Sequence, residues 1–444
     1  MKRPFRMMMA LAATLITFYL SPDTCMAQTA REEIRQNRWL AGSNYLDYDR
    51  QLPSFNYTKT PKGYVPFYFS HYGRHGSRWL IGNDDYKRVL RPLRKAREQG
   101  KLTREGQETL RKLELFNKTT DRRLGDLTTV GERQHHGIGQ RIAEHFPEIF
   151  VKKKGVAIDA RSTTVNRCIL SMVAECEELM AANPTARIHN DVSDALQYYL
   201  NQNWEGRVKE HGDKTWKLRE EFGLKNTHPE RLLGVLFNDQ RWAQDSIDTK
   251  HFMRNLFEVV INMQSHDGAP DLTGLFTEEE IYDQWRIQNA GWYINYGHSP
   301  LSGGIMPFSQ FNLLTNIIET ADTCVRLGKT QATLRFGHEV CVLPLACLME
   351  LDSCGVAVKN LDEVDLHWQN YKIFPMACNI QLIFYKPKKA RDYKSGATGD
   401  ILVKALLNER EASLPVPTTM HPYYRWDDVR AYWTKKLKDF TESR

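Results

Sequence analysis

The chain lacks the motifs that would assign it to several common classes of protein. Its eight cysteines include no Cys-x-x-Cys pair, so the usual zinc and redox motifs are absent. No Gly-x-x-x-x-Gly-Lys loop occurs, which excludes a P-loop nucleotide hydrolase. A net charge of +7 over 444 residues is too small to indicate a nucleic-acid partner. There are no internal repeats, and beyond the N-terminus no apolar run is long enough to span a membrane.

The N-terminus has the composition of a secretory signal peptide. Three basic residues precede an uncharged run over residues 7–20, and Cys25-Met26-Ala27 puts small residues before a cleavage point. We expect residues 1–27 to be removed and the protein to be periplasmic or secreted. Lipid attachment at Cys25 is the alternative, but the acidic residue just upstream of it fits a lipidation signal poorly.

The most informative segment is His-Tyr-Gly-Arg-His-Gly-Ser-Arg at residues 71–78. It follows an apolar run over residues 64–69 that predicts a buried strand, and strand C-terminal ends are where α/β sheets place their chemistry. The guanidinium groups of Arg74 and Arg78 suit phosphate oxygens, and a neutral His75 between them could attack phosphorus. The motif is short, so a basic surface loop is the alternative interpretation.

A second strand-and-helix unit occupies residues 157–167. Its short apolar strand ends at Arg161. Ser162 or Thr163 is the expected N-cap of the helix that then carries Arg167. This unit therefore adds arginines near the end of another strand.

A third strand ends in a histidine and a carboxylate. Residues 333–345 contain a short apolar strand, then His338-Glu339, then an apolar helix. Between the second motif and the first lies a glycine-containing segment over residues 125–141. Along the chain, the four segments occur in the order 71–78, 125–141, 157–167 and 333–345.

Together these segments resemble the histidine acid phosphatase branch of the histidine phosphatase superfamily, which includes phytases and multiple inositol-polyphosphate phosphatases. The resemblance spans roughly residues 60–345. It implies an α/β fold with a central mixed sheet flanked by helices and an inserted α-helical cap that meets the core over the active site. We therefore expect residues 28–190 and 301–444 to form the core and residues 191–300 to form the cap.

The resemblance also implies roles for individual residues. His75 would be the nucleophile that forms a phosphohistidine, and Glu339 would protonate the leaving oxygen and then activate water. Arg167 would support the residues that touch phosphate. The phosphate itself would be bound by Arg74, Arg78, Arg161 and His338. No metal or other cofactor is expected, because the arginines supply the charge that a metal would provide.

Two features depart from the family pattern. The acid phosphatases and many phytases of this branch carry His-Asp, and the inositol-polyphosphate group carries His-Ala-Glu, whereas here Glu339 follows His338 directly. The proline that usually follows the first motif is replaced by Trp79-Leu80. The first departure leaves the subgroup open, and the second leaves the shape of the pocket beside His75 open.

The other histidines have weaker claims to function. His71 is expected either at the edge of the sheet or in the core, with substrate contact as the less favoured alternative. His135 and His136 lie on a predicted helix and are expected to face solvent. His338-Glu339 is not a zinc-protease motif, because position 342 is valine rather than histidine.

Charge distribution bears on the substrate. Residues 83–123 predict a helical hairpin, and residues 83–126 contain thirteen Lys and Arg against eight Asp and Glu. From this hairpin, Lys87, Arg88 and Arg91 are candidates for binding additional phosphate groups. Against this, residues 191–300 carry a net charge of −7. The glutamate after His338 and the basic hairpin together favour inositol polyphosphates such as phytate as substrates.

The leading hypothesis is a phosphatase that acts on a phosphorylated small molecule, with no nucleic-acid partner and no membrane span. A broad-specificity acid phosphatase for simple phosphate monoesters is the main alternative. A phosphomutase of the same superfamily is disfavoured by the signal peptide and the large cap. A non-enzymatic carbohydrate-binding protein, suggested by export and ten tryptophans, would lack the His75 or Glu339 role, and neither is missing.

Overall fold

The structure is a computed structural model that describes residues 30–388 and 400–443. The expected signal peptide over residues 1–27 and the alternative lipidation site at Cys25 lie outside these ranges. Within them, no helix is both long enough and apolar enough to cross a membrane.

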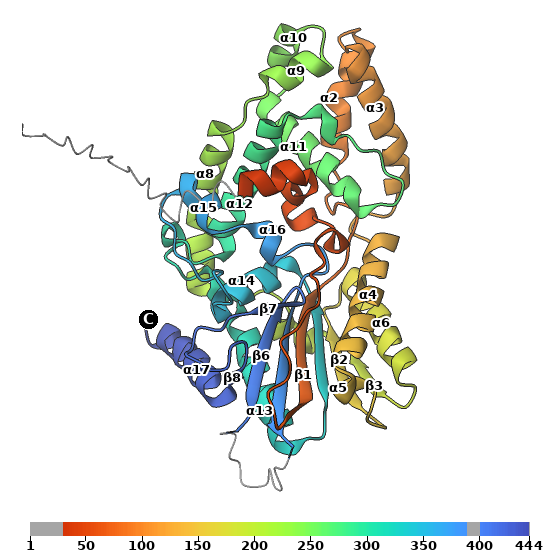
Figure 1. Ribbon diagram of the computed structural model, residues 1–444. Coiled ribbons are helices and arrows are strands. Elements are labelled where there is room, and N and C mark those ends of the chain that lie inside the picture. The colour runs from red at the N-terminus through yellow and green to blue at the C-terminus, as the bar shows by residue number, and fades with distance from the viewer. Residues whose placement is uncertain (1–29, 389–399, 444) are drawn as a thin grey trace, which may run out of the picture.

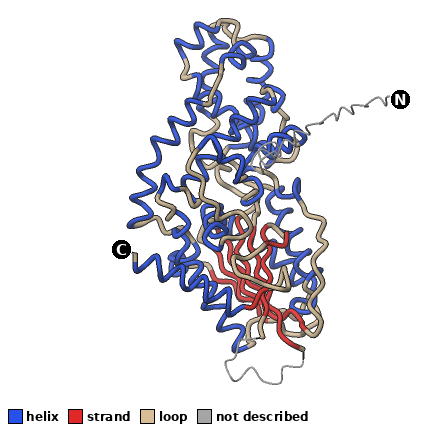
Figure 2. Tube along the Cα trace, turned by 60° about the vertical axis from the view of Figure 1, so that its left-hand side comes forward, coloured by secondary structure: helices blue, strands red, loops and turns tan. Residues whose placement is uncertain are grey.

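An eight-stranded mixed sheet forms one end of the molecule (Figure 2). Its order is β3 (Arg187–Asp191), β2 (Ala157–Ser162), β4 (Ala332–Gly337), β1 (Tyr64–Arg74), β5 (Asn379–Pro387), β6 (Leu402–Leu407) and β7 (Arg410–Ala412), with β8 (Tyr424–Arg425) also pairing with β6. The strands from β3 to β1 are parallel, and β5 to β8 pair antiparallel. This is the predicted central mixed sheet.

Helices cover both faces of the sheet (Figure 1). One face packs against α4 (Thr129–His145), α5 (Pro147–Phe150) and α6 (Asn166–Ala182), and the other against α13 (Phe311–Leu327), α14 (Glu339–Met349) and α17 (Trp426–Glu442). Alternation along β1 explains this arrangement, because Phe69 faces the first group whereas Tyr68 and Tyr72 face the second.

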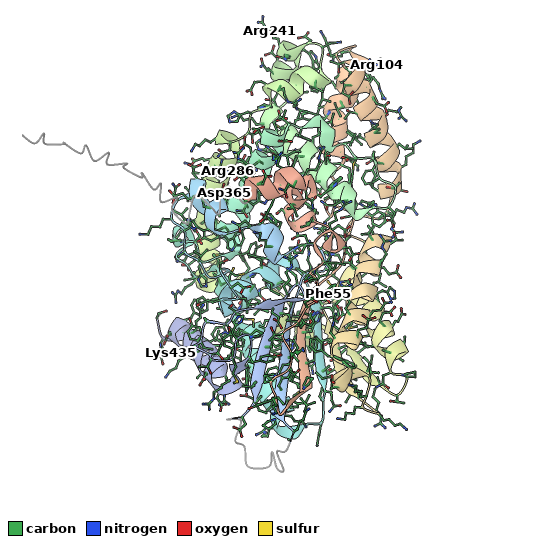
Figure 3. All side chains as sticks on the ribbon, in the orientation of Figure 1. Phe55, Arg104, Arg241, Arg286, Asp365 and Lys435 are labelled. Carbon is green, nitrogen blue, oxygen red and sulfur yellow. The ribbon has the colours of Figure 1, made fainter. Side chains whose placement is uncertain are left out.

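A second body of helices, which we call the helical lobe, lies beyond one end of the sheet. It comprises α2 (Lys87–Glu98), α3 (Arg104–Asn117), α8 (Gly206–Lys225), α9 (Glu230–Leu236), α10 (Gln240–Ser246), α11 (Thr249–Asn262) and α12 (Glu278–Tyr296). Leu93, Leu110, Leu233 and Trp285 belong to one buried cluster, so the hairpin α2–α3 packs with the later helices. Arg104 and Arg241 lie at the end of this lobe farthest from the sheet (Figure 3).

Short helices join the lobe to the sheet. These are α7 (Gln197–Leu200), α15 (Val364–His367) and α16 (Asn370–Ile373). An ion pair ties the lobe to α15, because Arg286 Nε of α12 lies 3.5 Å from Asp365 Oδ2, and Figure 3 labels both residues side by side.

Local sequence signals predicted several of these helices. The expected hairpin over residues 83–123 is α2 and α3, which turn at Gly100 with a φ of 66°. One local prediction was wrong. Neither Ser162 nor Thr163 caps α6, which begins at Asn166 with Val165 as its N-cap, so the helix starts two or three residues later than expected.

Candidate active site

Two parallel strands bring the two histidine motifs together. Arg74 at the end of β1 lies opposite Gly337 at the end of β4, so the residues that follow each strand leave the sheet side by side. The ring centroids of His75 and His338 are 5.7 Å apart. Glu339 then begins α14 directly after His338. A histidine from β1 and a carboxylate at a helix N-terminus therefore share one site.

The backbone of residues 74–77, which we call the catalytic segment, has a hydrogen-bond partner for every N–H and C=O. The N–H groups of the four residues in turn donate to Cys378 O (2.8 Å), Gly337 O (3.0 Å), Ser171 Oγ (3.1 Å) and Gln134 Oε1 (2.9 Å). The four carbonyls in turn accept from the His135 ring, the Ala377 N–H, the His75 ring and the Thr128 N–H. Such a segment holds its side chains in one geometry.

The catalytic segment packs so closely against α4 that neither Gly76 nor Gly131 has room for a side chain. A Cβ on Gly76 would lie 2.3 Å from the carbonyl oxygen of Gly131, and a Cβ on Gly131 would lie 2.3 Å from Ser77 O. Both glycines therefore let the catalytic segment rest directly on the first turn of α4.

His75 is held in the tautomer that a nucleophile requires. Its Nδ1 lies 2.8 Å from the carbonyl oxygen of Gly76, which can only accept, so Nδ1 carries the proton and Nε2 keeps its lone pair. Burial, together with the positive charges of Arg74 and Arg167, holds the pKa of His75 well below 6.5. The ring is therefore neutral at physiological pH, and its Nε2 has no hydrogen-bond partner among the described residues.

Glu339 occupies the centre of the arginine cluster. Its carboxylate oxygens lie 3.0 Å from Arg74 Nε, 3.8 Å from Arg78 Nη2 and 3.5 Å from His75 Nε2. Burial alone would raise its pKa, but the positive charges of Arg74 and Arg78 hold the pKa well below 4.5. Glu339 is thus a carboxylate in the free protein and neutralises part of the cluster.

Arg74 is fixed by backbone carbonyls. Its Nη1 donates to Asn44 O at 2.6 Å, Pro375 O at 3.1 Å and Phe374 O at 3.3 Å. Its Nη2 is buried without a hydrogen-bond partner in the described parts of the chain. The Arg74 guanidinium and the unprotonated His75 Nε2 lie 3.0 and 3.5 Å from the same Glu339 oxygen. An anionic ligand would satisfy the unpartnered guanidinium nitrogen there.

The two arginines of the second motif have different positions. Arg161 donates to Tyr199 Oη at 3.0 Å and pairs with Asp159 at 2.6 Å, so the structure does not bring it to the cluster. Arg167 is half-buried and contributes to lowering the pKa of both His75 and His338. The helix, rather than the strand end, supplies the third arginine. The phosphate-binding role of Arg161 and the supporting role of Arg167 stay predictions.

His338 is buried and neutral beside this cluster. Burial lowers its pKa to about 4, and the positive charge of Arg167 acts in the same direction. Its Nε2 lies 3.3 Å from the hydroxyl of Thr163. One of the two residues expected to cap α6 therefore contacts the site histidine instead.

Three other histidines lie outside the cluster. His135 was expected in solvent but is fully buried, with its ring between Glu175 and the carbonyl of Arg74. His136 is half-buried and lies 2.8 Å from Glu178. His71 is in the core, where burial lowers its pKa to about 4.

A cleft of about 530 Å³ is lined by helices of the helical lobe and by Asn44 and Tyr45, the residues that contact Arg74 and Arg78. Its lining includes Tyr45, whose ring lies 5.4 Å from the guanidinium carbon of Arg78, and three arginines from three helices. These arginines are Arg88 of α2, Arg219 of α8 and Arg254 of α11.

The sequence identified only one of these cleft arginines. Arg88 was a candidate, but Lys87 does not line the cleft and Arg91 pairs with Asp84 on the surface. Arg219 and Arg254 were missed because the acidic composition of residues 191–300 hid them. One signal was present, since His251, Arg254 and Glu258 recur at helical spacing on one face of α11.

One trio of metal-ligand type occurs among the described residues. Ligand atoms of His75, His338 and Glu339 lie within 4.8 Å of one another. The surrounding guanidinium groups of Arg74 and Arg78 repel a cation and favour an anion in the same place.

The fold is that of the histidine acid phosphatase group, which confirms the predicted resemblance at the level of fold. A multiple inositol polyphosphate phosphatase from Bifidobacterium longum, solved with inositol hexasulfate, superposes with a TM-score of 0.72 at 18% identity over 88% of this chain and 97% of its own.

Two phytase structures are also similar. The D. castellii phytase has a TM-score of 0.65 at 14% identity, over 90% of this chain and 85% of its own. The Hafnia alvei phytase has a TM-score of 0.52 at 11% identity, over 85% and 98%. No family model matches the sequence, and no curated protein matches it either.

Proposed function

We propose that this protein is a phosphomonoesterase that acts through a covalent phosphohistidine on His75. The observation that carries the proposal is that an unprotonated His75 Nε2 and the Arg74 guanidinium both lie within 3.5 Å of the same Glu339 oxygen. The lone pair suits attack on phosphorus, and the guanidinium suits the phosphoryl oxygens. Arg78, Arg167 and His338 complete the set that would stabilise the transferring group.

The first half-reaction uses Glu339 as an acid. A bound phosphate takes Arg74 and Arg78 away from Glu339, and the two negative charges in one cluster raise the pKa of the carboxyl group, so it takes up a proton. His75 Nε2 then attacks phosphorus, the bond from phosphorus to the ester oxygen breaks, and Glu339 protonates the departing oxygen.

The second half-reaction uses the same carboxylate as a base. Glu339 removes a proton from water, the water oxygen attacks phosphorus, and the bond between phosphorus and His75 Nε2 breaks. Inorganic phosphate leaves and the neutral imidazole is restored. No further reactant is needed.

The proposed substrates are inositol polyphosphates such as phytate. The cleft beside the arginine cluster presents Arg88, Arg219 and Arg254, which would bind phosphate groups that are not being hydrolysed. The similar structures carry the names of phytases and of an inositol polyphosphate phosphatase. Lys87, next to Arg88 on α2, would add positive potential near the cleft, whereas Arg91 is neutralised by Asp84. Secretion or export to the periplasm completes the proposal.

A broad-specificity acid phosphatase is the second candidate. It is favoured by two ion pairs, because Glu258 of the same cleft pairs with Arg88 at 2.5 Å and Glu220 pairs with Arg254 at 3.0 Å. Two of the three cleft arginines are thereby neutralised. A simple monoester needs only the cluster around His75.

The test compares specificity constants for inositol hexakisphosphate and p-nitrophenyl phosphate in the wild type, an Arg219→Gln/Arg254→Gln variant and a His75→Ala variant. Phosphate release from either substrate that disappears in His75→Ala supports the phosphatase. A selective loss on the hexakisphosphate in the double variant, which added salt reproduces in the wild type, supports the polyphosphate substrate. Equal losses on both substrates would favour the second candidate, and full turnover in His75→Ala would overturn the covalent mechanism.

A further inference from the structure

One face of α6 is directed at the catalytic segment over three successive turns. Arg167, Ser171 and Glu175 recur every four residues and therefore lie above one another on that face. Arg167 belongs to the arginine cluster around Glu339, and the hydroxyl of Ser171 accepts a hydrogen bond from the N–H of Gly76. Glu175 is the third member, and the proposed chemistry does not use it.

Glu175 belongs to a buried polar group behind β1. Its Oε2 lies 3.1 Å from His135 Nδ1, and its Oε1 lies 3.9 Å from His71 Nε2. All three side chains are almost completely excluded from solvent. Both histidine rings pack against the ring of Phe336. Because buried polar groups are costly unless they are paired, this group needs an explanation beyond packing.

The hydrogen-bond partners of His135 define where its protons are. Its Nε2 lies 3.1 Å from the carbonyl oxygen of Arg74, which can only accept, so Nε2 must carry a proton. A hydrogen bond between Nδ1 and Glu175 Oε2 requires one more proton between those two atoms. Whichever atom holds that proton, His135 donates to Arg74 through Nε2, and Glu175 fixes the plane of the ring.

This donor acts on the peptide group that joins Arg74 to His75. The carbonyl of that peptide group accepts from His135, and its N–H donates to Gly337 O at 3.0 Å from the opposite strand. Fixing both ends sets the direction in which the Arg74 and His75 side chains leave the backbone. Close approach of the two helices supports this, since a Cβ on Gly139 of α4 would lie 2.7 Å from Glu175 O.

We propose that His135, oriented by Glu175, is a positioning residue that aims the His75 nucleophile through the carbonyl of Arg74. This role rests on the proposed function, because it concerns the rate of phosphoryl transfer to His75. It assigns a purpose to a buried histidine and glutamate that never touch the substrate. Misplacement of a reacting group by about 1 Å can cost on the order of 100-fold in rate.

The experiment measures the rate constant of phosphoenzyme formation by rapid quench with p-nitrophenyl phosphate, per active site titrated by the burst amplitude. His135→Phe keeps the ring shape but removes the donor, and we expect a rate constant about 10- to 100-fold lower. His135→Gln places an amide N–H near the position of Nε2, and we expect it to stay within about threefold of the wild type. A merely structural role would lower the burst amplitude or the melting temperature and leave the rate constant per site unchanged.

The matched control is His136→Ala, since the neighbouring residue on α4 pairs with Glu178 and has no contact with the catalytic segment. If His135→Phe does not fold, the rate constants of phosphoenzyme formation in Glu175→Leu and Glu175→Gln test the positioning role instead. The amide can donate to Nδ1 and should preserve the rate constant, whereas leucine should lower it. A normal rate constant in both His135→Phe and Glu175→Leu overturns the positioning role alone. A wild type that forms no phosphoenzyme overturns the proposed function, and this role with it.

Discussion

Glu339 lies where an anionic ligand would otherwise lie, between Arg74 and Arg78. We expect Glu339→Gln to bind phosphate at least as well as the wild type, because the competing carboxylate charge is removed. Its kcat on an alkyl phosphate such as glycerol 2-phosphate should fall by about 10²- to 10⁴-fold, because a poor leaving group needs a proton donor. On p-nitrophenyl phosphate the loss should be smaller in the phosphorylation step. Equal losses in single-turnover phosphorylation would place the proton donor elsewhere.

Separate substitutions of Arg161 and Arg167 test which of the two arginines contributes to catalysis. Arg167→Gln should lower kcat/KM by about 10²- to 10³-fold, the cost typical of removing one donor to a developing anion. Arg161→Gln is the control, because its guanidinium contacts Tyr199 and Asp159, and its kcat/KM should stay within about fivefold of the wild type. Steady-state kinetics on one substrate decide between them. A larger loss in the Arg161 variant would reverse the assignment.

These two residues also show what sequence reasoning could reach. The motif around His75 and the pair His338-Glu339 could be located from their positions after apolar runs, since strand ends are predictable from local pattern. The choice between Arg161 and Arg167 depends on where α6 begins, and helix boundaries are uncertain by a few residues. The burial of His135 depends on the helix face that meets the sheet, which only tertiary packing determines.

At the scale of elements, the first turn of α4 supports the catalytic segment through backbone contact. Gly131→Ala would put a Cβ 2.3 Å from Ser77 O, so we expect a loss of about 2 kcal/mol or more in the free energy of unfolding, together with lower turnover. Gly137→Ala in the same helix meets only the end of the Arg141 side chain, at 2.8 Å. It should be neutral or stabilising by about 0.5–1 kcal/mol, because alanine favours helix. Urea unfolding of both variants is the measurement, and equal stabilities would contradict the packing argument.

The helices themselves were largely predictable, but their grouping was not. The hairpin α2–α3 and the capping box at Thr277 and Glu280 follow from local composition. That α2 and α3 share a buried cluster with α9 and α12 depends on contacts between segments more than 100 residues apart. For the same reason, composition alone did not reveal that Arg219 and Arg254 face the cleft.

At the scale of the whole molecule, buried neutral histidines limit stability in acid. Burial lowers the pKa of His71, His266 and His338 to about 4, against 6.5 when exposed. The unfolded chain therefore binds protons between about pH 6.5 and 4 that the folded chain does not, so the free energy of unfolding falls as the pH falls through this window. The slope is at most about 1.4 kcal/mol per pH unit for each histidine.

Urea denaturation at pH 7, 5.5 and 4.5 measures this slope. His71→Gln should reduce the loss between pH 6.5 and 4.5, whereas His189→Gln, with a side chain that is 76% exposed, should leave it unchanged. Glu339 acts in a lower window, since its depressed pKa makes its contribution disappear only as the pH falls well below 4.5. A free energy of unfolding that is constant from pH 7 to 4.5 would show that these histidines are protonated without cost.

The saturated hydrogen bonding of residues 74–77 has a consequence for how specificity can change. A segment whose every backbone donor and acceptor is hydrogen-bonded has no alternative conformation of similar energy. Substitutions elsewhere therefore cannot easily change its backbone conformation. The cleft arginines, by contrast, stand on three separate helices of the lobe, and each can be replaced without disturbing that backbone. The proposed chemistry and the choice of substrate can therefore change independently, because the residues proposed for phosphoryl transfer share one rigid segment while the cleft charges can vary one helix at a time.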